Sequence, residues 1–235
     1  MSDIHLEESR PDIAEIFFRF LSQDVKHADA LYILGDFFEA WIGDDDVTDF
    51  NTQIMDMLLS VTKTGFPIYL MHGNRDFLLG KKFLKKTGCR LLPDEYVVDL
   101  AGTPTLLMHG DTLCTADIAY LKFRKTSRNW FMQQLFLWKP LKKRQAIAAN
   151  MREKSKLYTS TASAAIMDVT QAEVERVMQK HHAQHLIHGH THRPAVHHFE
   201  LNQLPATRTV LAPWHECGSV LVCDDAGKQE VIVLK

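Results

Sequence analysis

The sequence predicts an α/β fold of layered sheets flanked by helices, with a helical segment inserted. Helical and strand-like stretches alternate over the first half of the chain, and the tail is one strand pattern after another. Between them, residues 118–165 carry no strand pattern and are basic and helical in character. Alternating elements followed by antiparallel strands indicate layered sheets. The segment that interrupts them is expected to be a separate helical subdomain.

The first half supplies helices and buried strands in turn. Helical spacing covers RPDIAEIFFRFLSQDV, with a proline suited to a first turn, and residues 48–64, with Thr48 as N-cap. The apolar runs ALYILGD and FPIYLMHGN end near glycine and predict buried strands. GKKFLKKTG predicts a short helix closed by Gly88, and EYVVDLAGTPTLLMHGD predicts a hairpin.

The second half begins with the basic segment, for which a helix break is expected at Pro140. Residues 167–182 predict one further helix. A buried strand then runs into GHTH, and TRTVLAP, SVLVCDD and QEVIVLK follow as strands, the last two joined by the turn DDAGK.

The composition is that of an ordinary globular protein, but the charge is unevenly distributed. Of 235 residues, 46% are hydrophobic and 24% charged, and the formal net charge is −2. Residues 118–160 hold eleven Lys or Arg and one acid, a local charge of +10, which leaves −12 for the rest. Such asymmetry indicates an anionic partner at the basic segment.

The cysteines and the N-terminus indicate a reducing compartment. The chain has four cysteines without C-x-x-C or zinc-ribbon spacing: Cys89, Cys114, Cys217 and Cys223. The N-terminus is charged from Asp3 onward, and no apolar stretch approaches the roughly 20 residues of a membrane span. We expect a cytoplasmic protein that can lie on a membrane.

Polar side chains of one chemical kind follow the ends of the predicted strands. Ligands in open α/β sheets collect at the carboxyl ends of strands, so these groups are expected to converge. The candidate metal ligands are Asp3, His5, Asp36, Asn74, His109, His190 and His192. A set of carboxylates, imidazoles and an amide without thiolate favours hard or borderline divalent cations. Seven ligands suit two ions that share one carboxylate.

Each motif alone has an ordinary explanation. A Gly-Asp pair after a strand is commonly a turn, Asp-x-His near a terminus is usually surface, and Gly-Asn-Arg-Asp fits an Asx-stabilised loop. Two imidazoles beside a glycine turn are less common. Five such segments in order, each after a strand, make coincidence improbable. His188 points the same way in an extended chain and is expected only to support the other histidines.

The ordered motifs D-x-H, G-D, G-N-x-D, H-G-D and G-H-x-H resemble the signature of the calcineurin-like metallophosphoesterases. The longer stretches LYILGDFFEAWIGDDD, HGNRDFLLG, LMHGDTLCT, AIMDV and LIHGHTHRPAVH resemble the UDP-2,3-diacylglucosamine diphosphatase family of lipid A biosynthesis. The likeness covers nearly the whole chain. It implies a layered α/β/β/α sandwich formed by residues 1–117 and 166–235, with an inserted helical cap at 118–165.

The resemblance also implies an activity and its cofactors. The family cleaves the pyrophosphate of UDP-2,3-diacylglucosamine by water attack at the uridyl phosphorus and releases UMP and 2,3-diacylglucosamine 1-phosphate. Two Mn²⁺ ions are implied. One would be held by Asp3, His5 and His192, the other by Asn74, His109 and His190, with Asp36 as the bridge.

Residue roles carry over from the same motifs. The implied catalytic residues are Asp36, Asn74, Arg75 and His190, and the implied substrate-binding residues are Asn74, Arg75, Asp117, Arg152, Ser155 and His190. Most relatives in the superfamily have histidine where this chain has Arg75, a permanent cation that recognises phosphate. Thr159 and Ala162 replace a family Asn and Lys, which is expected to weaken substrate contacts. Relatives carry a complete first strand before D-x-H, whereas only Met1 and Ser2 precede Asp3 here, so the resemblance implies a stunted first strand or a start further upstream.

The inserted stretch RNWFMQQLFLWKPLKKR interleaves aromatic and basic residues. Its apolar side chains either pack on the domain or face a membrane, where aromatics sit at headgroup level and cations meet anionic lipid. Similar segments in the family hold acyl chains. The expected partners are UDP-2,3-diacylglucosamine and the anionic cytoplasmic face of the inner membrane, with no nucleic acid, and the chain is expected to be a monomer.

Two other functions compete with this interpretation. A metal-dependent phosphodiesterase could act on another substrate such as nucleic acid, because a basic aromatic segment can stack on single strands. The acidic balance elsewhere and the clustering of the apolar residues count against it. A non-enzymatic scaffold is disfavoured because every metal-ligand type is present.

Overall fold

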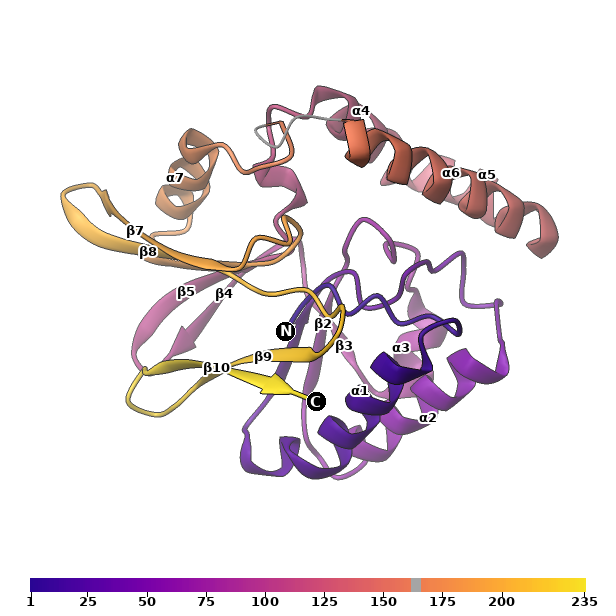
Figure 1. Cartoon of the computed structure of the whole chain (residues 1–235), viewed down its shortest axis with the longest axis horizontal. Coiled ribbons are helices and arrows are strands. Elements are labelled where there is room, and N and C mark those ends of the chain that lie inside the picture. The colour runs from indigo at the N-terminus through magenta and orange to yellow at the C-terminus, as the bar shows by residue number, and fades with distance from the viewer. Residues whose placement is uncertain (162–165) are drawn as a thin grey trace.

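Two sheets lie face to face, and helices cover their outer faces (Figure 1). The computed structural model describes residues 1–161 and 166–235. Three helices cover the first sheet and one covers the second: α1 (Pro11–Gln23), α2 (Asp49–Thr62), α3 (Lys81–Thr87) and α7 (Gln171–Lys180). The predicted α/β class and its layered arrangement are therefore confirmed.

The first sheet is short, parallel and three-stranded. It contains β1 (Leu31–Leu34), β2 (Ile68–Met71) and β3 (Arg90–Leu91) in that order. The sequence did not predict β3, which has two exposed residues. Residues 1–6 run beside β1 through backbone hydrogen bonds, such as Leu34 N–H to Met1 O at 2.9 Å, with one isolated bridge, Leu6 to Phe38. The expected first strand is thus reduced to an irregular segment beside β1.

The second sheet has five strands in the order β4-β5-β6-β8-β7. They are β4 (Glu95–Leu100), β5 (Thr103–Met108), β6 (His185–His188), β7 (Ala195–Leu201) and β8 (Leu204–Val210). Strands β5, β6 and β8 are parallel, and the edge strands β4 and β7 are antiparallel to their neighbours. The sequence did not predict β7, because five of its seven side chains are exposed and only Phe199 and Leu201 turn toward the core. A separate hairpin follows: β9 (Gly218–Cys223) and β10 (Gln229–Leu234).

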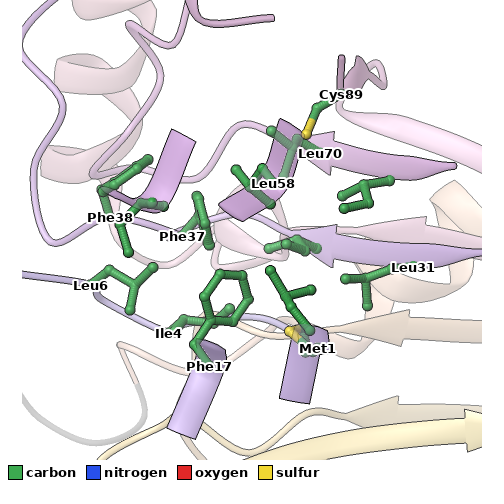
Figure 2. Packing of buried hydrophobic residues seen from close by; sticks show 14 of the residues in the cluster. Met1, Ile4, Leu6, Phe17, Leu31, Phe37, Phe38, Leu58, Leu70 and Cys89 are labelled. Carbon is green, nitrogen blue, oxygen red and sulfur yellow. The ribbon is translucent and has the colours of Figure 1, made fainter. Parts of the chain in front are cut away.

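Three apolar clusters hold the layers together. The largest lies between the first sheet and its helices and includes Phe17 and Phe37 (Figure 2) as well as Trp214, all at most 1% exposed. A second lies under α7, and a third joins the facing sides of the two sheets through side chains such as Leu34 and Ile187. Burial of this much apolar surface fixes the sheets against each other and so fixes the relative positions of their strand ends.

The predicted helix ends are correct where local chemistry defines them. Thr48 caps α2, because its Oγ1 accepts a hydrogen bond from Asn51 N–H at 3.0 Å. Gly88 ends α3 in the left-handed conformation, with φ of 73°. Helix α7 begins four residues later than the predicted 167. In the part of the chain that the structure describes, no helix is both long and apolar enough to cross a bilayer.

The basic segment forms three helices in a layer of its own (Figure 1). They are α4 (Ile118–Ser127), α5 (Trp130–Leu137) and α6 (Leu141–Thr161), and Pro140 lies between the last two as predicted. Neither α4 nor α5 has a buried residue, and the side chains of Phe131 and Trp138 are 70% and 80% exposed. These two aromatics therefore do not pack on the domain.

Arg144 is an exception in this segment. It is 2% exposed, and its Nη1 donates to Ile42 O at 2.7 Å and to Asp45 Oδ1 at 2.8 Å. It ends the stretch RNWFMQQLFLWKPLKKR, whose cations are expected to meet anionic lipid. That expectation is wrong for Arg144, because its guanidinium fastens α6 to the loop that follows β1.

Replacing Arg144 by Ala should lower the free energy of unfolding by roughly 1–3 kcal/mol, because the carbonyl of Ile42 loses its buried donor. Exposed Lys143 is the matched control, and Lys143→Ala should change the free energy of unfolding by no more than about 0.5 kcal/mol. Urea denaturation followed by circular dichroism measures both. Equal stabilities of the two variants would contradict the anchoring role of Arg144.

Candidate metal centre

The candidate ligands converge where four strands end. Asp36 follows β1, Asn74 follows β2, His109 directly follows β5, and the pair His190 and His192 follows β6. These four strands end at the same edge of the two facing sheets. The ligands that follow them therefore meet at the carboxyl ends of strands, as predicted. The fifth segment, residues 3–5, reaches the same place because Asp3 N–H bonds to Gly35 O at 3.1 Å.

One group gathers around Asp3, which is fully buried. Ligand atoms of Asp3, His5 and His192 all lie within 4.8 Å of one another. Asp3 Oδ1 lies 3.3 Å from His192 Nε2. The other oxygen, Oδ2, accepts a hydrogen bond from the backbone N–H of His190 at 2.9 Å, which draws the histidine loop onto the N-terminal segment.

A second group gathers around Asn74. Its Oδ1 lies 3.0 Å from both His109 Nε2 and His190 Nδ1. Asp36 lies between the groups: Oδ2 is 3.8 Å from His5 Nε2, and Oδ1 is 3.8 Å from His109 Nε2. The seven residues thus divide into two clusters with Asp36 in contact range of both. Asp3 also approaches Asp36 and His109 to within 4.8 Å.

The ring nitrogens are oriented by outer partners. His109 Nδ1 donates to Leu34 O at 2.9 Å, since a carbonyl can only accept, and this contact turns Nε2 inward toward Asn74. His5 Nδ1 lies 2.9 Å from Glu39 Oε2, which leaves its Nε2 facing Asp36. No hydrogen-bond partner of His5 Nε2 is found among residues 1–161 and 166–235. An oriented, unpaired nitrogen beside a carboxylate is a feature of metal sites.

The backbone at the centre is unusual in two ways. Five of the seven candidate ligands have positive φ: Asp3, His5, Asp36, His190 and His192. Non-glycine residues reach this region at a cost of about 1–3 kcal/mol each, and such residues cluster at functional sites. The motif glycines allow close approach, because a Cβ on Gly73 would lie 2.1 Å from Asp36 Oδ1 and one on Gly189 would lie 2.1 Å from Asp3 Oδ2.

The electrostatics of the centre favour a cation. Burial works to lower the pKa of His109, but the carboxylates of Asp36 and Asp3 outweigh it and raise the pKa to about 9. Burial and the neighbouring His109 lower the pKa of His190 to about 4. The site therefore combines buried negative charge with a neutral imidazole lone pair. Its N and O donors fit divalent metal ions, and the residues present are suited to hold two.

Arg75 lies at the rim of the centre. Its backbone N–H donates to Asp36 Oδ1 at 2.8 Å, and its guanidinium Nη1 lies 3.4 Å from Glu39 Oε1. Asp76 braces the same loop, because its buried carboxylate accepts from Gly73 N–H at 2.8 Å and Phe37 N–H at 2.7 Å. The loops after β1 and β2 are thereby held together.

Three expected substrate residues lie at the start of the helical segment or on it, and not among the metal-ligand candidates. Asp117 is buried and caps α4 by accepting from Tyr120 N–H at 2.9 Å. Arg152 and Ser155 lie on α6, and Arg152 Nη1 is 3.7 Å from Glu7 Oε2. Arg152 also lines a cavity of about 300 Å³ between α6 and the loop after β1, which Glu39 lines from the other side. Ala162 lies outside the described residues, as does the side chain of Thr159.

The residues that support the ligands were not predicted from the sequence. Glu39 follows Asp36 by three positions in GDFFEAW, and Asp76 ends GNRD, so both lay inside recognised motifs. Asp111, which follows His109 by two positions, accepts from Arg124 Nε at 2.7 Å and joins α4 to the centre. A carboxylate two or three positions after Asp36, Asn74 and His109 was the available signal.

His188 has a structural role in this arrangement. It is fully buried, its Nδ1 donates to Gly189 O at 2.8 Å, and its Nε2 accepts from Arg208 Nη1 at 3.1 Å. Both nitrogens are occupied, so neither is free for a metal ion. Arg208, which sequence analysis did not single out, orients this ring.

Comparison with known proteins agrees with the geometry of the centre. A family model described as calcineurin-like phosphoesterase matches residues 1–194. The chain belongs to that family. Members share the hydrolysis of phosphoester bonds at a metal centre, which is the chemistry that converging carboxylates and imidazoles support.

Curated relatives define a narrower family. The chain is 53% identical to a UDP-2,3-diacylglucosamine hydrolase of Marinobacter nauticus, over 92% of this chain and 88% of the relative. It is 52% identical to one of Escherichia coli, over 94% and 92% of the two chains, and 48% identical to one of Photobacterium profundum, over 97% and 93%. The chain is a member of the family that these hydrolases form.

Acid should destabilise the protein partly through His188. Burial lowers its pKa to about 3, so the unfolded chain binds a proton below about pH 6.5 that the folded chain does not. The folded state should lose about 2 kcal/mol between pH 7.5 and pH 5 from this group alone. His188→Gln should remove that part of the loss.

Urea denaturation of chelator-treated protein at the two pH values measures the effect. Exposed His27 provides the control, and His27→Gln should keep the wild-type pH dependence. The same acid-induced loss of stability in His188→Gln as in the wild type would show that His188 is not held neutral.

Proposed function

We propose that this chain hydrolyses the pyrophosphate bond of UDP-2,3-diacylglucosamine, giving UMP and 2,3-diacylglucosamine 1-phosphate in lipid A biosynthesis. One observation carries the proposal. Relatives that share about half of their residues with this chain, over more than nine-tenths of it, are named for hydrolysis of that substrate. The metal-ligand types and their convergence support the same reaction class.

Two Mn²⁺ ions are the proposed cofactors. Asp3, His5 and His192 would hold one, Asn74, His109 and His190 the other, and Asp36 both. Bound divalent ions would supply an activated water and neutralise charge on the phosphoryl oxygens. Oxygen and nitrogen donors together suit manganese better than magnesium, which prefers all-oxygen octahedral sites.

The reaction is a displacement at the uridyl phosphorus. The water oxygen forms a bond to that phosphorus, the bond to the bridging oxygen breaks, and the water proton is released to solvent. The leaving group is a phosphate monoester, a weak base that needs no acid. Arg75 would place a fixed positive charge beside the phosphoryl oxygens, and Glu39 holds that guanidinium at the rim.

The helical segment is the proposed site for the acyl chains and for membrane contact. Trp130, Phe131, Leu135 and Trp138 are at least half exposed, an arrangement that costs hydration free energy unless lipid covers it. Lys142 and Lys143 lie exposed beside them and would meet anionic headgroups on the cytoplasmic face of the inner membrane. Arg152 and Ser155 on α6 would contact the glucosamine phosphate. The chain would act there as a peripheral protein and a monomer.

A substrate panel tests the function. With Mn²⁺, the protein should hydrolyse UDP-2,3-diacylglucosamine at least 100-fold more efficiently than UDP-glucosamine without acyl chains, bis-p-nitrophenyl phosphate or single-stranded DNA. Chelation should abolish the activity, and Mn²⁺ should restore it better than Mg²⁺. Preference for the DNA would establish the phosphodiesterase alternative, and full activity after verified metal removal would reject the metal mechanism.

The acyl-binding role has its own test. Replacing Phe131 and Phe136 together by Gln should reduce kcat/KM for UDP-2,3-diacylglucosamine by roughly 10–1,000-fold, because each buried methylene is worth about 0.8 kcal/mol. Hydrolysis of a small phosphodiester should be nearly unchanged.

Exposed apolar residues away from the cap give the matched control. Val231→Thr with Ile232→Thr on the β9–β10 hairpin should affect neither activity. Equal loss of both activities in the Phe131 and Phe136 variant would mean that these side chains support the fold instead. No loss of either would place the acyl chains elsewhere.

A further inference from the structure

A second cavity lies behind the histidine loop, on the face of the five-stranded sheet that α7 covers. Its volume is about 230 Å³. Arg208 on β8 and His197 on β7 are register partners, so their side chains form its floor together. Thr191, Arg193 and Asp168 line its wall. We call these five residues the Arg208 cavity.

The charge of the cavity is unbalanced. Arg208 is 6% exposed and forms no ion pair with any carboxylate of the described residues. Its Nη1 donates to the neutral His188, and its Nε has no partner in the described part of the chain. Residues 162–165 read Ala-Ser-Ala-Ala, so they contain no carboxylate either. A buried guanidinium without an anion is costly, and burial accordingly lowers the pKa of Arg208.

The only carboxylate that lines the cavity, among residues that the structure describes, already has a partner. Asp168 Oδ2 lies 2.9 Å from Arg193 Nη1, and both side chains are more than 40% exposed, so the cavity is open to solvent. Two guanidinium groups thus face one carboxylate. One hydroxyl also lacks a hydrogen bond: Thr191 Oγ1 is buried and has no hydrogen-bond partner among the described residues.

We propose that the Arg208 cavity binds a phosphate group as an anion site distinct from the metal centre. A tetrahedral oxyanion can accept two parallel hydrogen bonds from a guanidinium, and a second cation and a hydroxyl complete a common phosphate environment. The cavity volume is ample for such a group. The metal centre lies on the other side of the loop, at the sheet edge.

The Arg208 cavity lies against the loop that carries His190 and His192, so an anion bound there would affect that loop. Thr191 lies between His190 and His192, and Arg208 orients His188 in the same loop. An anion that contacts Thr191 and Arg208 would restrain the backbone that presents both histidines. Occupancy should therefore stabilise the loop as well as balance the charge.

The phosphate group has two available sources, inorganic phosphate and a nucleoside monophosphate such as UMP. Isothermal titration calorimetry distinguishes the two sources. Inorganic phosphate or UMP is titrated into chelator-treated protein at constant ionic strength, and the binding affinities are compared. Chelation removes metal-dependent phosphate binding. Wild type should bind one of the two probes at one equivalent per chain, and the tighter probe identifies the source.

Variants assign the site. Arg208→Gln and Arg193→Gln should each weaken binding at least tenfold, and exposed His197→Gln should weaken it less. Arg193 is partly exposed, so its variant keeps the test valid if Arg208→Gln does not fold. Arg75→Gln is the control. Arg75 lies at the rim of the metal centre and outside the Arg208 cavity, so this variant should bind the probe as tightly as the wild type.

The outcomes decide between two sites. Loss of binding in the Arg208 and Arg193 variants, with binding kept in Arg75→Gln, supports the Arg208 cavity. Binding of neither probe overturns the proposal. It is also overturned if binding is lost in Arg75→Gln and kept in the two cavity variants, since the phosphate then belongs to the metal centre.

Discussion

Asp3 and Asp36 are two buried carboxylates that, with His109, bring ligand atoms within 4.8 Å of one another. Like charges at such separation in a buried site repel strongly unless positive charge lies between them. The imidazoles around them supply part of it, which is why the pKa of His109 rises. Divalent cations would supply the rest. The architecture of the centre follows from holding these two carboxylates together.

Both sheets are needed to meet that constraint. Asp36 and Asn74 come from the first sheet, and His109 and His190 come from the second. The apolar cluster between the sheets fixes the distance across which they meet. The loops then turn sharply, with positive φ at five candidate ligands, and Gly73 and Gly189 let the chains approach. Packing of the sheets therefore stabilises a strained backbone that would not form alone.

Much of this could be read from the sequence because the ligand motifs directly follow apolar strands. Four of the five segments do follow strands, and the ligand candidates do converge. The edge strand β7 was missed, since five of its seven side chains are exposed and give too short an apolar pattern. The roles of Glu39 and Arg208 depend on contacts between distant segments, which spacing does not encode. Arg144 was misplaced for the same reason, because its partner lies 99 residues away.

The central claim is that Asp36 is shared by two metal ions. A crystal structure of the Mn²⁺-loaded protein, with anomalous scattering recorded at the manganese edge, tests it most directly. The account predicts two anomalous peaks, one between Asp3, His5 and His192 and the other among Asn74, His109 and His190, with Asp36 coordinated to both. A single peak, or two peaks that Asp36 does not join, would contradict it.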